Sequence, residues 1–125
     1  MPDEQQMRDA MQAYIDGFNN EDLAAITGLY ADDATVEDPV GTPLRQGRAE
    51  IDEFYAGALK TGAKLKLSAP IRASHGNAAA MAFEVALNYQ GADMVIHVID
   101  VMTFNEEGKF MSMKAYWGPG DMLPA

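Results

Sequence analysis

The chain has 125 residues, 48% of them hydrophobic and 22% charged, a composition typical of one globular domain with a proper core. Its formal net charge of −10 disfavours nucleic acid and anionic membranes as partners, because an acidic surface repels phosphate groups. The absence of cysteine excludes disulfides, thiolate nucleophiles and cysteine metal sites, and two histidines are too few for a histidine metal cluster.

The N-terminal segment, MPDEQQMRDA, is too polar to be a secretory signal, and no apolar run reaches the ~18 residues of a membrane span. We therefore expect a cytoplasmic protein that forms a single domain over residues 1–125. Residues 3–18 are predicted to form an amphipathic helix, because apolar side chains recur at steps of four, three and four. These side chains are Met7, Met11, Tyr14 and Phe18.

Two further helices and a short strand are predicted in the rest of the first half. A short helix capped by Asn20 would carry Tyr30 on its apolar face. Residues 34–38 have the pattern of a strand that stops at Pro39. A third amphipathic helix is expected over about residues 47–59.

After Gly62 the hydrophobic period changes from that of a helix to two, which indicates strands. The turns YQGAD and FNEEGK separate strands over about residues 93–104 and 109–117 from the strand before them. Helices followed by a strand meander indicate an α+β fold. We expect a curved antiparallel sheet with three N-terminal helices on its concave side and a pocket between the two layers.

Asp100 interrupts an apolar row in the segment VIHVIDVMTF. The other members of its alternating row are Met94, Ile96, Val98, Met102 and Phe104. Burial in such a row would raise the carboxyl pKa, so Asp100 is expected either to pair with a buried Arg or Lys or to stay protonated and donate a hydrogen bond. The alternative, a solvated face for this row, stays open, although the opposite row is itself largely apolar.

Three tyrosines, Tyr14, Tyr30 and Tyr55, are expected on or beside the apolar faces of the three helices. A tyrosine in such a position is most often part of the core, with its hydroxyl bonded to a backbone carbonyl. The alternative is that the hydroxyls converge beside Asp100. Two neutral donors would suit an oxygen that gains negative charge during a reaction.

The stretch YADDATVEDPVG holds four carboxylates and no Lys or Arg. Asp32 and Asp33 are expected to be solvated turn residues. Glu37 and Asp38 are adjacent in a strand and therefore point to opposite faces. If Asp38 shares the inner face with Val36, it enters the pocket and Glu37 faces outward. The alternative is that Asp38 only forms the turn before the proline.

The stretches YADDATVEDPVG, GRAEIDEFY, PIRASH, VIDVMTF and MKAYWG follow the order and spacing of a known family. In these stretches, which cover nearly the whole chain, the sequence resembles the bacterial ketosteroid isomerases, or steroid Δ5-3-ketoisomerases. The resemblance implies the fold group of nuclear transport factor 2, a cone of curved sheet and helices. Many unrelated functions use that fold, so the fold alone does not define the activity.

By this resemblance, Asp38 is the proton-transferring base, and Tyr14 and Asp100 are the two donors of the oxyanion hole. Tyr30 and Tyr55 extend the hydrogen-bond network behind Tyr14. An acid kept neutral by an apolar site, as proposed for Asp100, is a known feature of this family. The apolar residues that match positions lining the family's steroid pocket are Met81, Phe83, Val98, Met113 and Trp117.

The implied reaction moves the double bond of a 3-oxo-Δ5-steroid into conjugation through a dienolate, in a homodimer that needs no cofactor and no metal. A polyketide cyclase-like enzyme and a non-catalytic small-molecule binder of the same fold are the alternatives. The complete set of Tyr14, Asp38 and Asp100 favours the isomerase. Residues 61–66 and 90–97 depart from the family's pattern, which leaves the distal substrate contacts and the dimer surface open.

Overall fold

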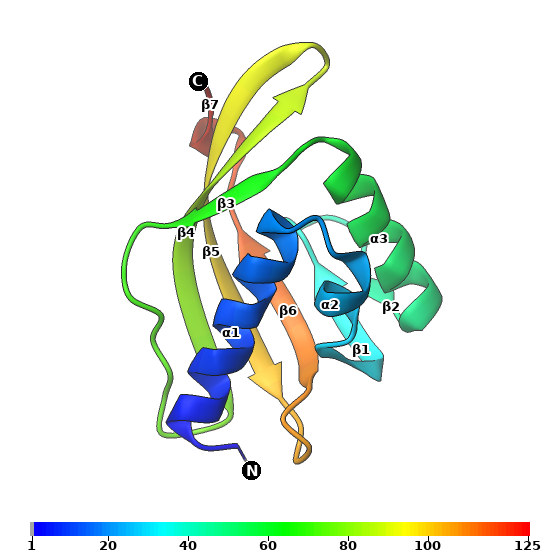
Figure 1. Cartoon of the computed structure of the whole chain (residues 1–125), viewed down its shortest axis with the longest axis vertical. Coiled ribbons are helices and arrows are strands. Elements are labelled where there is room, and N and C mark those ends of the chain that lie inside the picture. The colour runs from blue at the N-terminus through cyan, green and yellow to red at the C-terminus, as the bar shows by residue number, and fades with distance from the viewer. Residues whose placement is uncertain (1) are drawn as a thin grey trace.

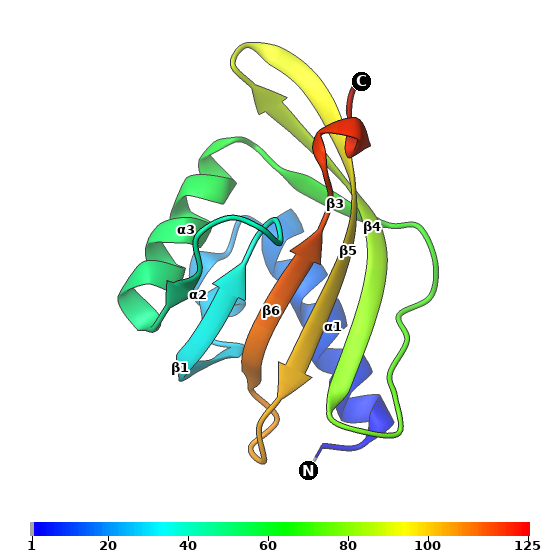
Figure 2. The ribbon, with the colours of Figure 1, turned by 180° about the vertical axis from the view of Figure 1, so that it is seen from behind.

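The computed structural model describes residues 2–125. Figure 1 shows a long curved sheet with the helices packed on one face, and Figure 2 shows the opposite face of the sheet. The helices are α1 (Glu4–Asn19), α2 (Leu23–Thr27), α3 (Arg48–Lys60) and the 3-10 turn η1 (Pro119–Asp121). The strands are β1 (Tyr30–Glu37), β2 (Arg45–Gln46), β3 (Lys64–Leu67), β4 (Ala78–Tyr89), β5 (Ala92–Phe104), β6 (Phe110–Tyr116) and β7 (Met122–Pro124).

The strands form one sheet in the order β2-β1-β6-β5-β4-β3, with β7 paired to β5. All of these pairs are antiparallel except β1 with β6, which is parallel, so the expected antiparallel sheet is in fact mixed. After β1 the chain passes through β2, α3 and the β3–β5 meander. It then returns as β6, which lies beside β1 and runs in the same direction. This crossover places the end of β1 beside the end of β6.

Helix α1 begins where the sequence predicts, because Asp3 provides its cap. The Asp3 carboxylate accepts a hydrogen bond from the Gln6 N–H at 2.8 Å, and the Gln6 side chain accepts one from the Asp3 N–H at 2.9 Å. The predicted apolar face is buried against the sheet and α2. Its members are Met7, Met11, Tyr14 and Phe18.

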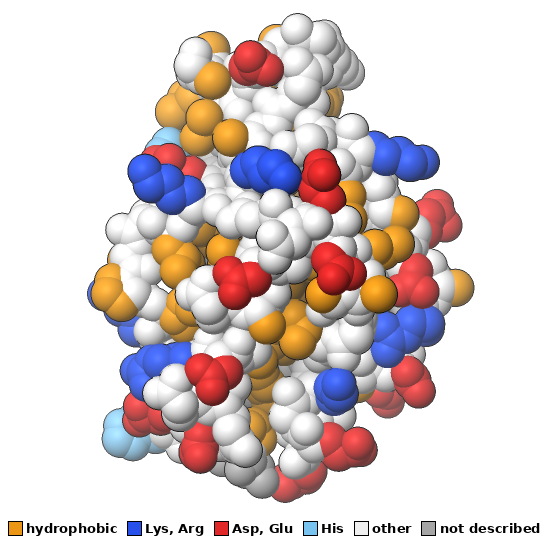
Figure 3. All heavy atoms as spheres, in the orientation of Figure 1, with side chains coloured by type: hydrophobic (Ala, Val, Ile, Leu, Met, Phe, Trp, Pro, Cys, Tyr) orange, Lys and Arg blue, Asp and Glu red, His pale blue; other side chains and the backbone are white. Residues whose placement is uncertain are grey.

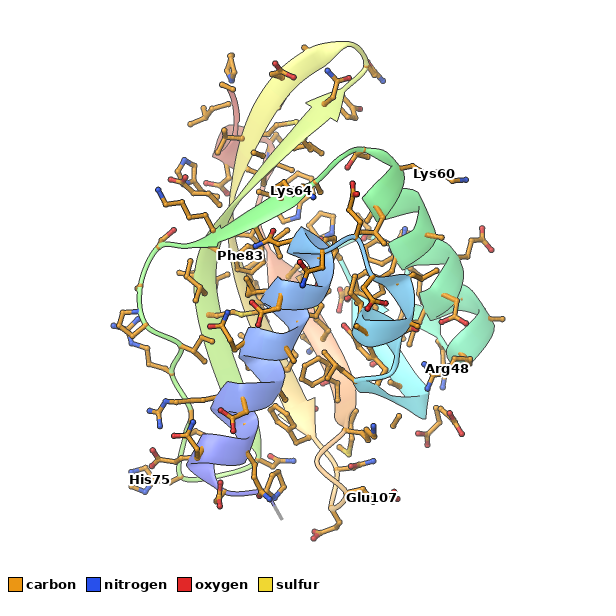
Figure 4. All side chains as sticks on the ribbon, viewed as in Figure 1. Arg48, Lys60, Lys64, His75, Phe83 and Glu107 are labelled. Atoms are coloured by element: carbon orange, nitrogen blue, oxygen red, sulfur yellow. The ribbon has the colours of Figure 1, made fainter. Side chains whose placement is uncertain are left out.

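The second helix is shorter than predicted, and Tyr30 does not belong to it. Asp22, not Asn20, caps α2, and Asn20 instead closes the end of α1. Gly28 follows the last turn of α2, and Tyr30 is the first residue of β1. Arg48, labelled at the start of α3 in Figure 4, donates to the Tyr30 carbonyl at 2.9 Å and so fixes this strand start against α3.

Strand β1 therefore begins four residues before the expected strand. Asp32 and Asp33 are exposed, as predicted, but they lie within the strand and not in a turn. The register of β1 against β6 shifts between Tyr30 and Thr35, so the ladder is irregular where these two acids lie. A bulge of this kind lets both adjacent side chains reach solvent.

The long hairpin of β4 and β5 supplies most of the inner wall and extends beyond the helices (Figure 1). Alternate β5 residues are buried as predicted: Ile96, Val98, Asp100, Met102 and Phe104. The inner face of the sheet and the buried faces of α1 and α3 form one continuous core. Asp100 therefore enters the interior on a row that is otherwise apolar.

Candidate active site

A largely apolar pocket of about 310 Å³ lies between the helices and the inner face of the sheet. Helices α1 and α3 form one wall, and β3, β4 and β5 form the other. Tyr14, Asp38 and Asp100 all line this pocket, although they come from α1, the end of β1 and the middle of β5. The fold thus brings together the three residues that the sequence singled out.

Asp100 lies between Met81 of β4 and Ala115 of β6, and only 1% of its surface is exposed. Within residues 2–125 it takes part in no ion pair, and its Oδ2 atom has no hydrogen-bond partner. Burial, and after it the charge of Asp38, raises the pKa of Asp100 well above its ordinary value. The structure therefore favours the protonated acid over the buried ion pair.

The three buried tyrosines form a chain of hydroxyls behind the pocket. The Tyr14 and Tyr55 hydroxyls are 3.1 Å apart, and the Tyr55 and Tyr30 hydroxyls are 2.5 Å apart. Burial is the main cause that raises the pKa of each of them well above 10. All three are neutral phenols at ordinary pH, and Tyr14 is the member of the chain that lines the pocket.

Asp38 directly follows β1 and faces the pocket. Val36, two residues earlier, is fully buried, while the Glu37 carboxylate accepts a hydrogen bond from the Gly41 N–H at 3.0 Å on the other side. The indole Nε1–H of Trp117 donates to Oδ1 of Asp38 at 2.9 Å. On balance the pKa of Asp38 is raised, because the effect of burial exceeds that of this hydrogen bond and of the charge of Arg45, both of which lower the pKa.

The two pocket carboxyls therefore have opposite surroundings. Asp38 has a hydrogen-bond donor and a nearby cation, both of which stabilise its ionised form. Asp100 has neither, and the charge of Asp38 further disfavours its ionisation. A pocket with one ionised and one protonated carboxyl can both accept a proton and donate a hydrogen bond.

The five apolar residues predicted to contact the steroid divide into two groups. Phe83, Val98 and Trp117 line the pocket. Met81 and Met113 do not line it and are buried in the core. Met81 sits on the same row as Phe83 but is directly opposite Asp100. Met81 is only 2% exposed and belongs to the core, whereas Phe83, labelled in Figure 4, lines the pocket.

Several pocket residues were not singled out in the sequence. The C-terminal half of α3 and its cap contribute Phe54, Ala58 and Thr61 to the pocket lining. The β4 row that includes Phe83 contributes Val85, Leu87 and Tyr89. The alternating pattern of β4 marks the second group as one face. A second signal was available for Trp117, because a buried indole N–H requires an acceptor.

Residues 2–125 contain no cluster of three or more His, Cys, Asp or Glu side chains that could hold a metal ion. No helix among them is long and apolar enough to cross a membrane.

A family model described as the SnoaL-like domain matches residues 11–113. The chain is 45% identical over 119 residues to the steroid Delta-isomerase of Nocardioides simplex, with 94% of each chain covered. It is also 27% identical over 125 residues to epoxide hydrolase LasB of Streptomyces lasalocidi. This match covers 97% of this chain but only 44% of LasB. The solved structure of SalBIII, an epoxide hydrolase/cyclase-like enzyme with a role in pyran ring formation in the polyether salinomycin, matches with a TM-score of 0.94 and 28% identity over the full length of both chains.

The curved sheet, the three helices and the family match define this chain as a SnoaL-like domain of the nuclear transport factor 2 fold group. Within that group it belongs to the ketosteroid isomerase family, as its identity to a steroid Delta-isomerase over nearly the whole chain shows. The predicted fold class and family resemblance are thus confirmed, apart from the parallel strand pair.

Proposed function

We propose that this protein is a steroid Δ5-3-ketoisomerase, with Asp38 as the base and with Tyr14 and Asp100 as the oxyanion donors. The observation that carries the proposal is the contrast between the two carboxyls of one apolar pocket. Asp38 accepts a hydrogen bond from Trp117, whereas Oδ2 of Asp100 has no partner among the described residues. The 45% identity to a steroid Delta-isomerase supports it independently.

In the proposed reaction, the Asp38 carboxylate removes a proton from the carbon between the ketone and the double bond. The electron pair moves onto the ketone oxygen and forms a dienolate. Asp38 then returns the proton two carbons further along, which leaves the double bond conjugated with the ketone. One carboxyl thus acts first as a base and then as an acid on the same face of a flat ligand.

The dienolate oxygen would be stabilised by hydrogen bonds from the Tyr14 hydroxyl and the protonated Asp100 carboxyl. Both donors are neutral, are fixed by burial and lie in a pocket with few competing polar groups. Such preorganised donors act where charge develops, and losing one typically lowers a rate by ~10²–10³. Tyr55 and Tyr30 would hold the Tyr14 hydroxyl in place from behind.

The direct test of this function is the appearance of a conjugated enone, followed by ultraviolet absorbance, with 5-androstene-3,17-dione as the substrate. The native protein should convert it, and Asp38→Asn, which keeps the size of the side chain but removes the base, should abolish nearly all turnover. Absence of an enone signal with the folded native protein would exclude the isomerase.

An epoxide-opening enzyme is the second candidate, because SalBIII matches the whole chain with a TM-score of 0.94. An acid that protonates the epoxide oxygen and a base that activates the nucleophile would also use one neutral and one ionised carboxyl. Incubation with a steroid epoxide and with the 3-oxo-Δ5-steroid separates the two functions. We expect turnover of the second compound only. A pure binder would bind both and convert neither, and it would gain nothing from the buried charge of Asp38.

We also propose that the protein is a homodimer joined through the sheet face opposite the helices. On that face Ile99 (50% exposed) and Tyr116 (46% exposed) are direct cross-strand neighbours, and Leu123 is exposed on β7. On the helical side, charged side chains of both signs are scattered among apolar ones (Figure 3). Exposed large apolar side chains on a sheet face favour a partner there. Sedimentation analysis should give a dimer, and Ile99→Lys should give a monomer.

The cytoplasmic location and the single-domain extent stay predictions from the sequence.

A further inference from the structure

Arg45 lies beside the proposed base on the inner face of the sheet. Strands β1 and β2 pair antiparallel with Val36 directly opposite Arg45, so these two side chains point to the same face. Val36 is fully buried, which identifies that face as the inner one. Asp38 follows Val36 by two residues and keeps its orientation. Arg45 and Asp38 are therefore diagonal neighbours, a relationship that typically places Cβ atoms ~7–8 Å apart.

The ring of Phe54 holds the Arg45 side chain at this place. The guanidinium carbon lies 4.4 Å from the centroid of the Phe54 ring, within the range of a cation–π contact. Phe54 also lines the pocket that contains Asp38, whereas Arg45 lines an adjoining groove along α3. The positive charge is thus fixed just outside the pocket wall and leaves the pocket itself apolar.

The charge of Arg45 is not neutralised by an ion pair. Within residues 2–125, no carboxylate oxygen lies in salt-bridge range of Arg45, and its Nη1 is buried without a hydrogen-bond partner. Glu50 and Glu53 line the same groove, but the Glu50 carboxylate accepts a hydrogen bond from the Gln46 N–H at 3.0 Å instead. The field of the guanidinium acts on Asp38, whose ionised form it stabilises.

We propose that Arg45 is a positioning residue that keeps Asp38 ionised in its apolar pocket. The role of Asp38 as a base rests on the proposed function, but the coupling between the two charges does not. Asp38 also faces Trp117 from the end of β6, Asp100 from β5 and Tyr14 from α1. Of these four neighbours only Arg45 carries a positive charge. Its charge lowers the pKa of Asp38, in opposition to burial.

Removal of this charge should have opposite consequences at low and at high pH. Loss of the cation should raise the pKa of Asp38, because the charge of Arg45 now lowers it. The acid limb of the pH profile, where kcat/KM rises with pH as Asp38 ionises, should move to higher pH by the same amount. Activity at pH values within this limb should therefore fall several-fold. On the plateau, activity should be unchanged or slightly higher, because a carboxylate of higher pKa is a stronger base. A loss of packing alone would lower activity at every pH.

The test compares native protein with Arg45→Gln and Arg45→Lys, and uses Lys60→Gln as the matched control. Lys60 is an exposed cation at the far end of α3, where Figure 4 shows it pointing away from the molecule. A readout that needs no activity is available, because Trp117 is the single tryptophan and donates to Asp38. Its fluorescence should titrate with Asp38, and Asp38→Asn should remove that transition.

We expect the fluorescence midpoint and the acid limb to rise together in Arg45→Gln, to return towards the native value in Arg45→Lys, and to stay unchanged in Lys60→Gln. An unchanged midpoint in folded Arg45→Gln, or an equal shift in Lys60→Gln, would overturn the role of Arg45. A shifted midpoint in a protein that does not isomerise the steroid would support the Arg45–Asp38 coupling and refute the proposed function.

Discussion

The indole of Trp117 donates to Oδ1 of Asp38 across 2.9 Å, although 79 residues separate them in the chain. The parallel pairing of β1 with β6 explains the contact. Glu37 pairs with Lys114 near the ends of the two strands, so the residues that follow each strand emerge at the same edge. A ring that would otherwise be only an apolar wall therefore orients the proposed base and stabilises its ionised form.

Trp117→Phe should raise the pKa of Asp38, because it removes the hydrogen bond that opposes the effect of burial. We expect the acid limb of kcat/KM to move up by about one pH unit, with a several-fold lower plateau from the less ordered carboxylate. The pH–rate profile measures both. Tyr89→Phe, at another aromatic residue of the pocket, is the control and should leave the limb in place. An unmoved limb in Trp117→Phe would contradict the role of the indole.

Tyr14→Phe should lower turnover by ~10²–10³, since it removes one donor to the dienolate oxygen. Its effect on the free energy of unfolding should be small, because the Tyr55 hydroxyl keeps its bond to Tyr30. Steady-state kinetics and urea unfolding of the same preparation separate the two effects. Native-like turnover in the variant would remove Tyr14 from the oxyanion hole.

Tyr55→Phe should show the reverse pattern. Tyr55 bonds both Tyr14 and Tyr30, so its loss leaves two buried hydroxyls without this partner. We expect a loss of unfolding free energy of about 1–3 kcal/mol and a fall in turnover of only about tenfold or less. If Tyr55→Phe were as inactive as Tyr14→Phe, the division between a donor and its support would not hold.

Asp100→Asn should change how stability depends on pH. The folded-state pKa of Asp100 is raised, so its contribution to stability is fully present below its unfolded value near 4 and is lost as pH rises towards the folded value. Asn does not titrate, so the variant should gain on the native protein by up to about 1.4 kcal/mol per pH unit through that window. Urea unfolding at several pH values measures the difference. Parallel stability curves would mean that Asp100 is not held neutral.

The sequence was sufficient for the helices that have a clear apolar face and for the long strands of the second half. The alternating apolar row favoured an interior position for Asp100 but left a solvated face open, and the structure confirms the interior position. Tyr30 was misplaced because Leu23, Ile26 and Tyr30 fit helical spacing, while the contact of the Tyr30 carbonyl with Arg48 depends on the tertiary fold.

Hydrophobic periodicity did not predict the contacts between residues that are distant in the sequence. The partner of a short strand such as β1 is not encoded in its own pattern, so neither the parallel pairing with β6 nor the hydrogen bond from Trp117 could be derived. Met81 and Phe83 share one row, yet only Phe83 lines the pocket, because alternation gives the face of a residue and not its position relative to a cavity. The catalytic assignments came from the family resemblance and stay proposals.

A crystal structure of the protein with a bound phenolic steroid tests the central claim most directly, because the phenol oxygen stands in for the dienolate oxygen. We predict that this oxygen lies within hydrogen-bond distance of both the Tyr14 hydroxyl and Oδ2 of Asp100, the atom that has no partner among the described residues. The Asp38 carboxylate should lie over the face of the adjacent ring. A phenol oxygen directed at the pocket mouth, away from Tyr14 and Asp100, would contradict the account.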